Sequence, residues 1–217
     1  MRTYGQYCGV ARSLELVGER WALLIVRDLI LGPRRFTDLQ RGLGTIPSNV
    51  LSSRLKELEE SGVIQRRAVP RPDRGVVYEL TEYGRELEPI VVDLLLWGMR
   101  SLGDPRPEDN FSANSFLLGL RVAFQSRAAR GLDATYEIRI DDSVFTVRVA
   151  NGKLALADGP ADAPDLTIET DLGLGALLQG EITAAEARKR KVVRLRGDAA
   201  LLDRFAAIFR LPTAANA

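Results

Sequence analysis

The fold of the N-terminal half is decided by residues 32–81, GPRRFTDLQRGLGTIPSNVLSSRLKELEESGVIQRRAVPRPDRGVVYELT. Within it we expect a short helix from Phe36, a break at Gly42–Gly44, and a second helix with Ser48 as its N-cap. An apolar pair directly after that helix and a second apolar run at 76–78 flank a loop rich in Pro, Arg and Gly. Such a pattern predicts a two-stranded hairpin.

The second helix has two contrasting faces. Leu51, Leu55 and Leu58 recur at i, i+4 and i+7, so they form one stripe that faces a core. The opposite side carries short polar side chains and a lysine, which can reach base edges when a helix lies in the DNA major groove. The order of elements is that of a winged helix-turn-helix. Its predicted DNA-binding face comprises Ser48, Asn49, Ser52, Ser53 and Lys56.

Basic residues are concentrated in the same stretch. Residues 34–74 hold nine Arg or Lys and five Asp or Glu, although the net charge of the whole chain is only +1. The local excess of positive charge lies where phosphate contacts are needed. We expect Arg35, Arg71 and Arg74 to contact DNA phosphates.

Three other basic residues have two interpretations each. Arg66 and Arg67 either contact phosphate or form a charged strand edge, a common protection against aggregation. Arg54 lies to the side of the predicted DNA-binding face and is equally placed to pair with Glu57.

A further apolar helix is expected after Thr81, its N-cap, with a kink at Pro89 because proline has no N–H to donate. Residues 94–97 are apolar around most of the helix circumference. A helix of this kind is buried either by a second domain or by another subunit.

Residues 5–100 resemble the HxlR-type transcriptional regulators, a branch of the winged-helix proteins. The resemblance rests on Cys8, a first helix ending at Gly18, Trp21 at the head of an apolar helix, and the motifs at 32–39, 51–58, 62–64 and 78–84. It implies a homodimeric regulator that binds double-stranded DNA, with Val10, Leu14 and Val17 of the first helix joining the apolar helix in the dimer. The chain departs from the family at 75–77, where a charged residue is expected before the tyrosine.

The C-terminal half has the pattern of an α+β domain. A polar, proline-rich linker at 103–109 predicts domains at 1–102 and 111–212. A helix of roughly 115–130 is expected first, followed by four or five strands that include a hairpin turn at Asn151-Gly152. The sheet is predicted to be rich in antiparallel pairs, with helices covering one of its faces.

Turn and cap residues mark the expected ends of further helices and strands in that domain. Asp141-Asp142 is typical of a turn, and Asp171 precedes a helix expected over 172–178. Thr183 and Glu186 have the spacing of a capping box. Asp198 is the predicted cap of the last helix.

Residues 111–212 resemble the sterol-carrier-protein fold, through motifs at 151–154, 164–168, 177–180, 197–198 and 205–212. The resemblance implies an apolar cavity for a lipid or another hydrophobic ligand, with candidate lining residues Leu177, Leu178, Phe205 and Phe209. The alternative is that these four side chains fill a core. Six basic residues within 188–196 form either a solvated face or a site for an anionic head group or for additional DNA contact.

Catalysis is poorly supported by the composition. The chain has no histidine, which removes the commonest general base, the usual triads and His-based metal sites. The single cysteine has no metal-ligand partners, and no glycine loop has the pattern of a phosphate cradle. We therefore expect no enzyme activity, no cofactor and no metal.

Cys8 has two interpretations as well. HxlR-type regulators include proteins that use an N-terminal cysteine as a redox sensor, and Arg12, one helical turn away, would lower the pKa of the thiol. The alternative is an ordinary packed cysteine.

The sequence therefore predicts a cytoplasmic DNA-binding transcriptional regulator that senses a hydrophobic small molecule. No apolar run reaches the ~20 residues of a membrane span, and no signal peptide is evident. The alternative is a lipid-binding carrier that uses the winged helix for protein contacts.

Overall fold

The computed structural model describes residues 3–70, 74–103, 112–140, 143–170 and 174–211. The chain divides into two compact units, unit 1 over residues 1–118 and unit 2 over residues 119–217. Each unit is described by itself below. No helix in the described ranges is long and apolar enough to cross a bilayer.

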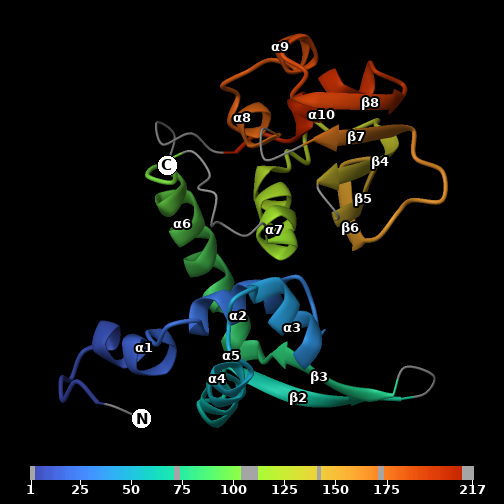
Figure 1. Cartoon of the computed structure of the whole chain (residues 1–217). Coiled ribbons are helices and arrows are strands. Elements are labelled where there is room, and N and C mark those ends of the chain that lie inside the picture. Colours follow the sequence, from blue (N-terminus) through green and yellow to red (C-terminus); the bar gives the residue numbers. More distant parts are fainter. Residues whose placement is uncertain (1–2, 71–73, 104–111, 141–142, 171–173, 212–217) are drawn as a thin grey trace. The chain divides into compact units, whose positions relative to one another are not determined.

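Unit 1 is a helical domain with a small three-stranded sheet (Figure 1). The sheet order is β1-β3-β2, and both pairings are antiparallel. The predicted hairpin is confirmed, since β2 and β3 pair along their whole length from Ile64↔Leu80 to Val69↔Gly75. The elements are α1 (Gly9–Val17), α2 (Ala22–Ile30), β1 (Arg34–Arg35), α3 (Phe36–Leu43), α4 (Ser48–Glu60), β2 (Ile64–Val69), β3 (Gly75–Leu80), α5 (Glu82–Arg85) and α6 (Leu87–Met99).

The leucine stripe of α4 lies in the core of unit 1, as its spacing predicts. Leu51, Leu55 and Leu58 are at most 2% exposed, and Ile25 and Leu39 are fully buried. Burial of large aliphatic side chains is worth roughly 1.5–3 kcal/mol each. The core therefore fixes the rotation of α4 about its own axis and with it the direction of the opposite face.

Of two predicted helix ends in unit 1, one is wrong and one is confirmed. Ser48 is the first residue of α4, and the N-cap is Pro47, which makes no side-chain cap hydrogen bond. Proline fits here because its φ of −65° suits the entry to a helix. The expected break at Gly42–Gly44 is confirmed, since α3 ends at Leu43 and its C-cap is Gly44, whose φ of 66° favours glycine.

The predicted kink at Pro89 is replaced by a break between α5 and α6. The helix after Thr81 stops at Arg85 and restarts at Leu87, so Pro89 lies in the first turn of α6. Proline is tolerated there because the N–H it lacks would have no helical acceptor. The cap at Thr81 is confirmed, since its Oγ1 accepts from the backbone N–H of Gly84 at 3.0 Å.

Unit 2 contains a five-stranded mixed sheet in the order β6-β5-β4-β7-β8 (Figure 1). Only β4 and β7 pair in parallel, so the prediction of an antiparallel-rich α+β domain is confirmed. α7 (Ala113–Ala123) spans the division between the units. The other elements are β4 (Asp133–Ile140), β5 (Ser143–Ala150), β6 (Lys153–Asp158), β7 (Leu166–Thr170), α8 (Leu174–Gln179), α9 (Ala184–Lys189), β8 (Val193–Gly197) and α10 (Leu201–Ile208).

One face of the sheet forms the core of unit 2. Cross-strand partners share a face, and Tyr136 of β4 is paired with Val147 on one side and Leu166 on the other. All three are fully buried. The ring of Phe205 in α10 contacts that of Tyr136 edge-on at 5.2 Å between centroids. α10 therefore covers this face.

Two local predictions in unit 2 are confirmed. Asn151 and Gly152 both have positive φ, 45° and 79°, as a tight hairpin turn requires. Thr183 and Glu186 form the capping box, with Thr183 Oγ1 accepting from the N–H of Glu186 at 3.1 Å.

Other predictions in unit 2 need correction. The helix expected over 115–130 ends at Ala123, because Phe124 forms a β-bridge with Phe209. Asp198 accepts from the N–H of Ala200 in the turn before α10, whose N-cap is Ala200. Predictions for most of the linker, for Asp141-Asp142 and for 171–173 lie outside the described residues.

Candidate nucleic-acid interface

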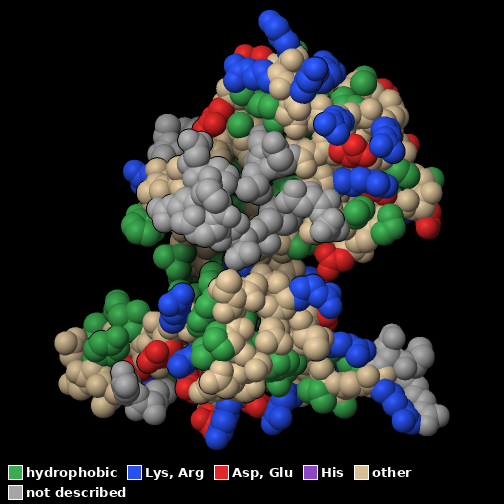
Figure 2. All heavy atoms as spheres, viewed as in Figure 1, with side chains coloured by type: hydrophobic (Ala, Val, Ile, Leu, Met, Phe, Trp, Pro, Cys, Tyr) green, Lys and Arg blue, Asp and Glu red, His purple; other side chains and the backbone are tan. Residues whose placement is uncertain are grey.

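The predicted DNA-binding residues of α4 share one exposed face. Their side chains lie opposite the buried leucines of the same helix, and in Figure 2 Lys and Arg side chains lie over α4 and along the β2–β3 hairpin. The helix begins two residues after Ile46, which is 3% exposed, so its first turn is anchored to the core. The residues on this exposed face are Ser48, Asn49, Ser52, Ser53 and Lys56.

Two of these residues are engaged within the helix. Ser53 donates from its hydroxyl to Glu57 at 3.2 Å, and the ammonium group of Lys56 lies 3.7 Å from a carboxylate oxygen of Glu60. The Lys56 side chain is 75% exposed. Exposed pairs of this kind stabilise a helix little, so they can be exchanged for contacts with DNA at small cost.

Arg54 lies outside the exposed face of α4 and forms ion pairs with acidic residues. Its guanidinium pairs with Glu57 on the same helix and lies 3.8 Å from Glu19, in the turn between α1 and α2. The side chain is only 19% exposed. Of its two sequence interpretations, the structure favours ion pairing.

The basic residues of β2 are also paired. Arg66 donates to Glu59 at 2.8 Å, which raises the pKa of Arg66, and Arg67 donates to Glu79 at 3.0 Å. Hydrogen bonds from Gln65 and Arg67 lower the pKa of Glu79. Both pairs are exposed ion pairs of the kind that contributes little to stability.

Arg35 connects the start of α3 to the base of the wing. Its Nη1 donates to the backbone carbonyl of Arg74 at 3.4 Å, and its backbone N–H donates to Asp38 at 3.3 Å. A Cβ at Gly75 would lie 3.3 Å from the same Nη1. The sequence pattern predicts a phosphate contact for Arg35 and does not reveal this link. Arg74 is exposed, and Arg71 lies outside the described residues.

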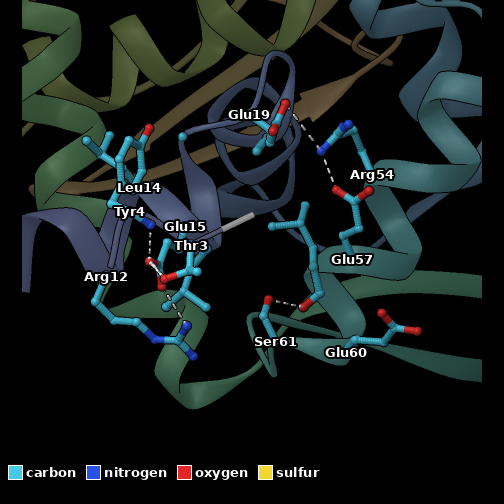
Figure 3. Close-up of a pocket in the computed structure, with 14 residues that line it drawn as sticks. Thr3, Tyr4, Arg12, Leu14, Glu15, Glu19, Arg54, Glu57, Glu60 and Ser61 are labelled. Atoms are coloured by element: carbon cyan, nitrogen blue, oxygen red, sulfur yellow. Dashed lines mark hydrogen bonds and ion pairs between the residues drawn. The ribbon is translucent and has the colours of Figure 1, made fainter. Parts of the chain in front are cut away.

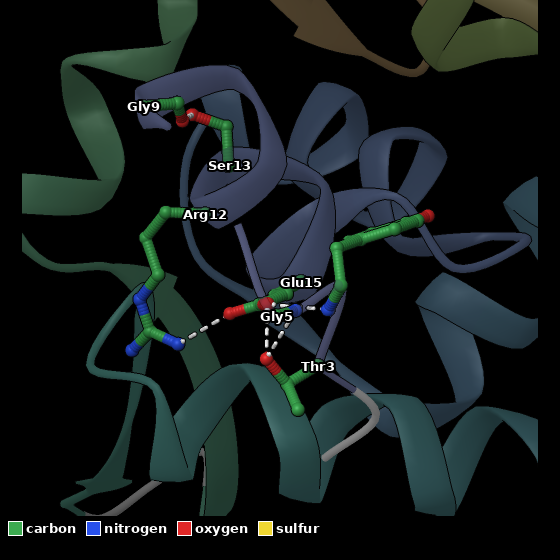
Figure 4. Close-up of polar contacts among 7 residues, drawn as sticks. Thr3, Gly5, Gly9, Arg12, Ser13 and Glu15 are labelled. Atoms are coloured by element: carbon green, nitrogen blue, oxygen red, sulfur yellow. Dashed lines mark hydrogen bonds and ion pairs between the residues drawn. The ribbon is translucent and has the colours of Figure 1, made fainter. Parts of the chain in front are cut away.

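Cys8 is exposed at the start of α1. Hydrogen bonds from the backbone N–H groups of Ala11 and Val10 lower the pKa of its thiol. The expected influence of Arg12 is a wrong prediction, because that guanidinium turns to Glu15 at 3.0 Å (Figure 4). The first turn of the helix, rather than a cation, stabilises the thiolate.

The four predicted ligand-binding residues of unit 2 lie in its core. Leu177 and Leu178 are 3% and 4% exposed, and Phe205 and Phe209 are fully buried. The rings of Phe205 and Phe209 lie 4.5 Å apart between centroids. Next to them, the hydroxyl of Tyr136 is buried without a hydrogen-bond partner in the described structure, and burial raises the pKa of Tyr136 to about 12.

A buried acid in unit 1 was missed by the sequence pattern. Asp28 is fully buried at the end of α2, where Arg27 donates to it at 2.8 Å. Burial raises the pKa of Asp28 more than Arg27 lowers it. The sequence gives no signal for its burial, because an adjacent Arg27-Asp28 pair in a helix is equally typical of an exposed ion pair. Among the described residues, no group of three or more His, Cys, Asp or Glu could hold a metal ion.

Two family patterns match the chain. That of the HxlR-like helix-turn-helix matches residues 16–105, and that of the alkyl sulfatase C-terminal domain matches residues 108–215. The family matched by the C-terminal half is thus the alkyl sulfatase C-terminal domain, and the expected resemblance to the sterol-carrier-protein fold is not supported by this match.

Three similar proteins illustrate these matches. An uncharacterized HTH-type transcriptional regulator of Mycobacterium tuberculosis is 50% identical over 99 residues, 46% of this chain and 61% of the relative. The chain thus spans about three fifths of that relative. The uncharacterized HTH-type transcriptional regulator YvaP of Bacillus subtilis is 36% identical over 86 residues, 40% of this chain and 80% of YvaP. A solved structure of the sec-alkyl sulfatase PisA1 is 20% identical, with a TM-score of 0.42, over 48% of this chain and 17% of that one.

Proposed function

Since the chain belongs, through its N-terminal half, to the HxlR-like helix-turn-helix family, we propose that it is a sequence-specific DNA-binding transcriptional regulator. Unit 1 binds double-stranded DNA as part of a homodimer. Unit 2 senses a hydrophobic small molecule and passes the signal on as a change in DNA affinity.

The exposed face of α4 carries this proposal. Asn49, Ser52 and Ser53 offer neutral hydrogen-bonding groups, and Lys56 adds one exposed cation. Side chains of these types read base edges in the major groove. The buried contacts of Leu51 and its neighbours keep the opposite face of α4 exposed to solvent. Arg35, Arg71 and Arg74 contact the DNA phosphates.

The homodimer is proposed from apolar side chains that unit 1 leaves exposed. On α6, Ile90, Leu94 and Trp97 are 51%, 44% and 68% exposed, and on α1 Val10 and Leu14 are 69% and 45% exposed. Figure 2 shows hydrophobic side chains gathered over α1. Exposed apolar patches of this kind mark interaction sites.

One residue expected in that interface is placed elsewhere. Val17 is 8% exposed within unit 1 and belongs to its core. A two-fold dimer would set two copies of α4 about 34 Å apart, one turn of DNA.

Sedimentation of Trp97→Asp tests the dimer. A charge in the centre of an apolar interface is expected to shift the protein from dimer to monomer. Glu86→Gln, at the exposed N-cap of α6, is the control and should remain dimeric. A wild-type protein that is monomeric at micromolar concentration contradicts the proposed interface.

For unit 2 we propose a ligand site of the sterol-carrier type in the apolar interior around Leu177, Leu178, Phe205 and Phe209. The support is the apolar character of this interior and the buried Tyr136 hydroxyl beside it, which offers one hydrogen bond to a ligand. A ligand shifts DNA affinity only through its different affinities for the two states of the dimer. Ligand that co-purifies with the full chain, identified by mass spectrometry, is the direct test.

Selection from a random duplex library tests DNA recognition. The full chain is expected to enrich one motif with two-fold symmetry, and its affinity should fall steeply with salt, by about one log unit per log unit of salt for each phosphate neutralised. A lipid carrier that uses the winged helix for protein contacts would enrich no motif and show no such slope.

A further inference from the structure

Unit 1 contains a hollow of about 860 Å³ beside the DNA-binding helix (Figure 3). Residues of the N-terminal segment and α1 line one side, and residues of α4 line the other. Cavities that bind small molecules are generally about 300–1,000 Å³ in volume. The hollow is thus large enough for a ligand, and it is separate from the proposed interior site of unit 2.

The lining of this hollow is rich in carboxylates. Four glutamates and two arginines contribute to it. Glu15 is already satisfied, because it accepts hydrogen bonds from the Thr3 hydroxyl, the Tyr4 backbone N–H and Arg12 (Figure 4). These bonds lower its pKa and tie the N-terminal segment to α1. Glu15 therefore has a structural role in the lining and is not free to bind a ligand.

Uncompensated negative charge remains on the α4 side. The single guanidinium of Arg54 serves both Glu19, at 3.8 Å, and Glu57. The side chains of Glu19 and Glu57 are 52% and 48% exposed, so water and ligands can reach them. Glu60 has its own partner, since Lys56 lies 3.7 Å away. One cation between two carboxylates leaves an excess charge of about −1, which attracts a positive ligand.

Apolar groups complete the lining. Leu16 and Leu58 form part of the wall, and Leu58 is 1% exposed. Tyr4, on the side opposite Glu19 and Glu57, also lines the hollow and is 59% exposed (Figure 3). An aromatic residue and carboxylates in one lining favour an organic cation, because a cation is attracted both to an aromatic ring and to negative charge.

We propose that this hollow is a binding site for an organic cation with an apolar body. The positive centre lies against Glu19 and Glu57, and the apolar body packs on Tyr4, Leu16 and Leu58. Because Ser53 of the DNA-binding face donates to Glu57, a cation at Glu57 also perturbs that face. This last link depends on the proposed DNA-binding function, whereas binding of the cation does not.

Titration calorimetry with two ions of the same shape tests the charge preference. Tetraphenylphosphonium, a cation, is expected to bind the full chain, and tetraphenylborate, the matching anion, is not. The double substitution Glu19→Gln and Glu57→Gln should weaken cation binding by at least about tenfold. The control, Glu82→Gln with Glu86→Gln, changes the net charge equally at exposed positions outside the hollow and should bind as the wild type does.

A filling substitution keeps the test independent of the Arg54 ion pairs. Leu16→Trp adds volume without changing charge and should abolish cation binding while circular dichroism stays native. Equal binding of both ions, or an equal loss in the control double variant, overturns the proposal. DNA affinity measured with and without tetraphenylphosphonium then tests the link to α4. An unchanged DNA affinity with intact cation binding removes that link alone.

Discussion

Besides its buried core, unit 1 leaves several large apolar side chains exposed, whereas the large aromatic side chains of the unit 2 core are buried. Among the described residues, the large hydrophobic side chains that stand exposed all belong to unit 1, and Trp97 and Tyr7 are examples. In unit 2, Tyr136, Phe145, Phe205 and Phe209 are at most 1% exposed. A surface of the first kind is typical of an interaction site, in line with the proposed homodimer. An interior of the second kind has to rearrange before it can admit a ligand.

Among the substitutions that test this difference between the units, Phe205→Ala is expected to have the largest effect on stability. The ring is fully buried against Tyr136 and Phe209, so its loss should lower the free energy of unfolding of unit 2 by about 3–5 kcal/mol. Both tryptophans of the chain, Trp21 and Trp97, lie in unit 1. In a urea titration, tryptophan fluorescence should therefore keep its wild-type midpoint while part of the far-UV circular dichroism signal is lost earlier. A common shift of both signals would show that the units unfold together.

A smaller effect is expected on the exposed side of the comparison. Asn49→Ala should leave the stability of unit 1 unchanged and weaken operator binding by about 1–3 kcal/mol at one base pair. Arg74→Ala should weaken all DNA sequences alike and reduce the salt slope by about 1. Fluorescence anisotropy with the selected operator and with single-base variants separates the two patterns. If replacing both Asn49 and Lys56 leaves affinity unchanged, α4 does not read the bases.

Two helix caps provide a matched pair across the units. Thr81 accepts from Gly84 in unit 1, and Thr183 accepts from Glu186 in unit 2. Replacing either threonine by alanine should cost about 1 kcal/mol in its own unit. Only Thr81→Ala should move the tryptophan fluorescence midpoint. A shift caused by Thr183→Ala would mean that the stability of unit 2 supports unit 1.

The smallest effect concerns Cys8, whose pKa is lowered by the first turn of α1. Because the lowered pKa favours the thiolate, the rate of alkylation by iodoacetamide should rise at a lower pH than it does for a free cysteine. Cys8→Ser is the blank, since Cys8 is the only cysteine in the chain. Operator affinity measured before and after treatment with diamide then tests whether the thiol is a redox sensor. A pH profile equal to that of free cysteine removes the chemical basis for sensing.

Features that depend on local sequence could be predicted. The spacing of Leu51, Leu55 and Leu58 predicts the buried stripe of α4, and Thr81 and Thr183 predict their caps, because each signal lies within one or two helical turns. The order of a winged helix followed by an α+β region follows from a series of such signals, whereas the two compact units divide after Leu118 and not at the expected linker. The exposed face of α4 follows from the same periodicity.

Features that depend on distant contacts could not be predicted. The early end of α7 is caused by the bridge from Phe124 to Phe209, and no local residue announces it. The ion pair of Arg54 with Glu19 depends on the approach of α1 to α4. The burial of Asp28 depends on how α2 packs against its neighbours. In each case the local sequence around the residue does not indicate which distant residue it will contact.

Contacts between the start and the end of unit 2 affect the order in which the two units fold during translation. Gln125 donates to the carbonyl of Arg210, 85 positions later, at 3.2 Å. β4 needs β7 as its parallel neighbour before it is central in the sheet. Domains with such distant pairings fold slowly, and N-terminal domains generally fold first on the ribosome. Unit 1 can therefore be complete, with its apolar helices exposed, while the last strand and helix of unit 2 are still being translated.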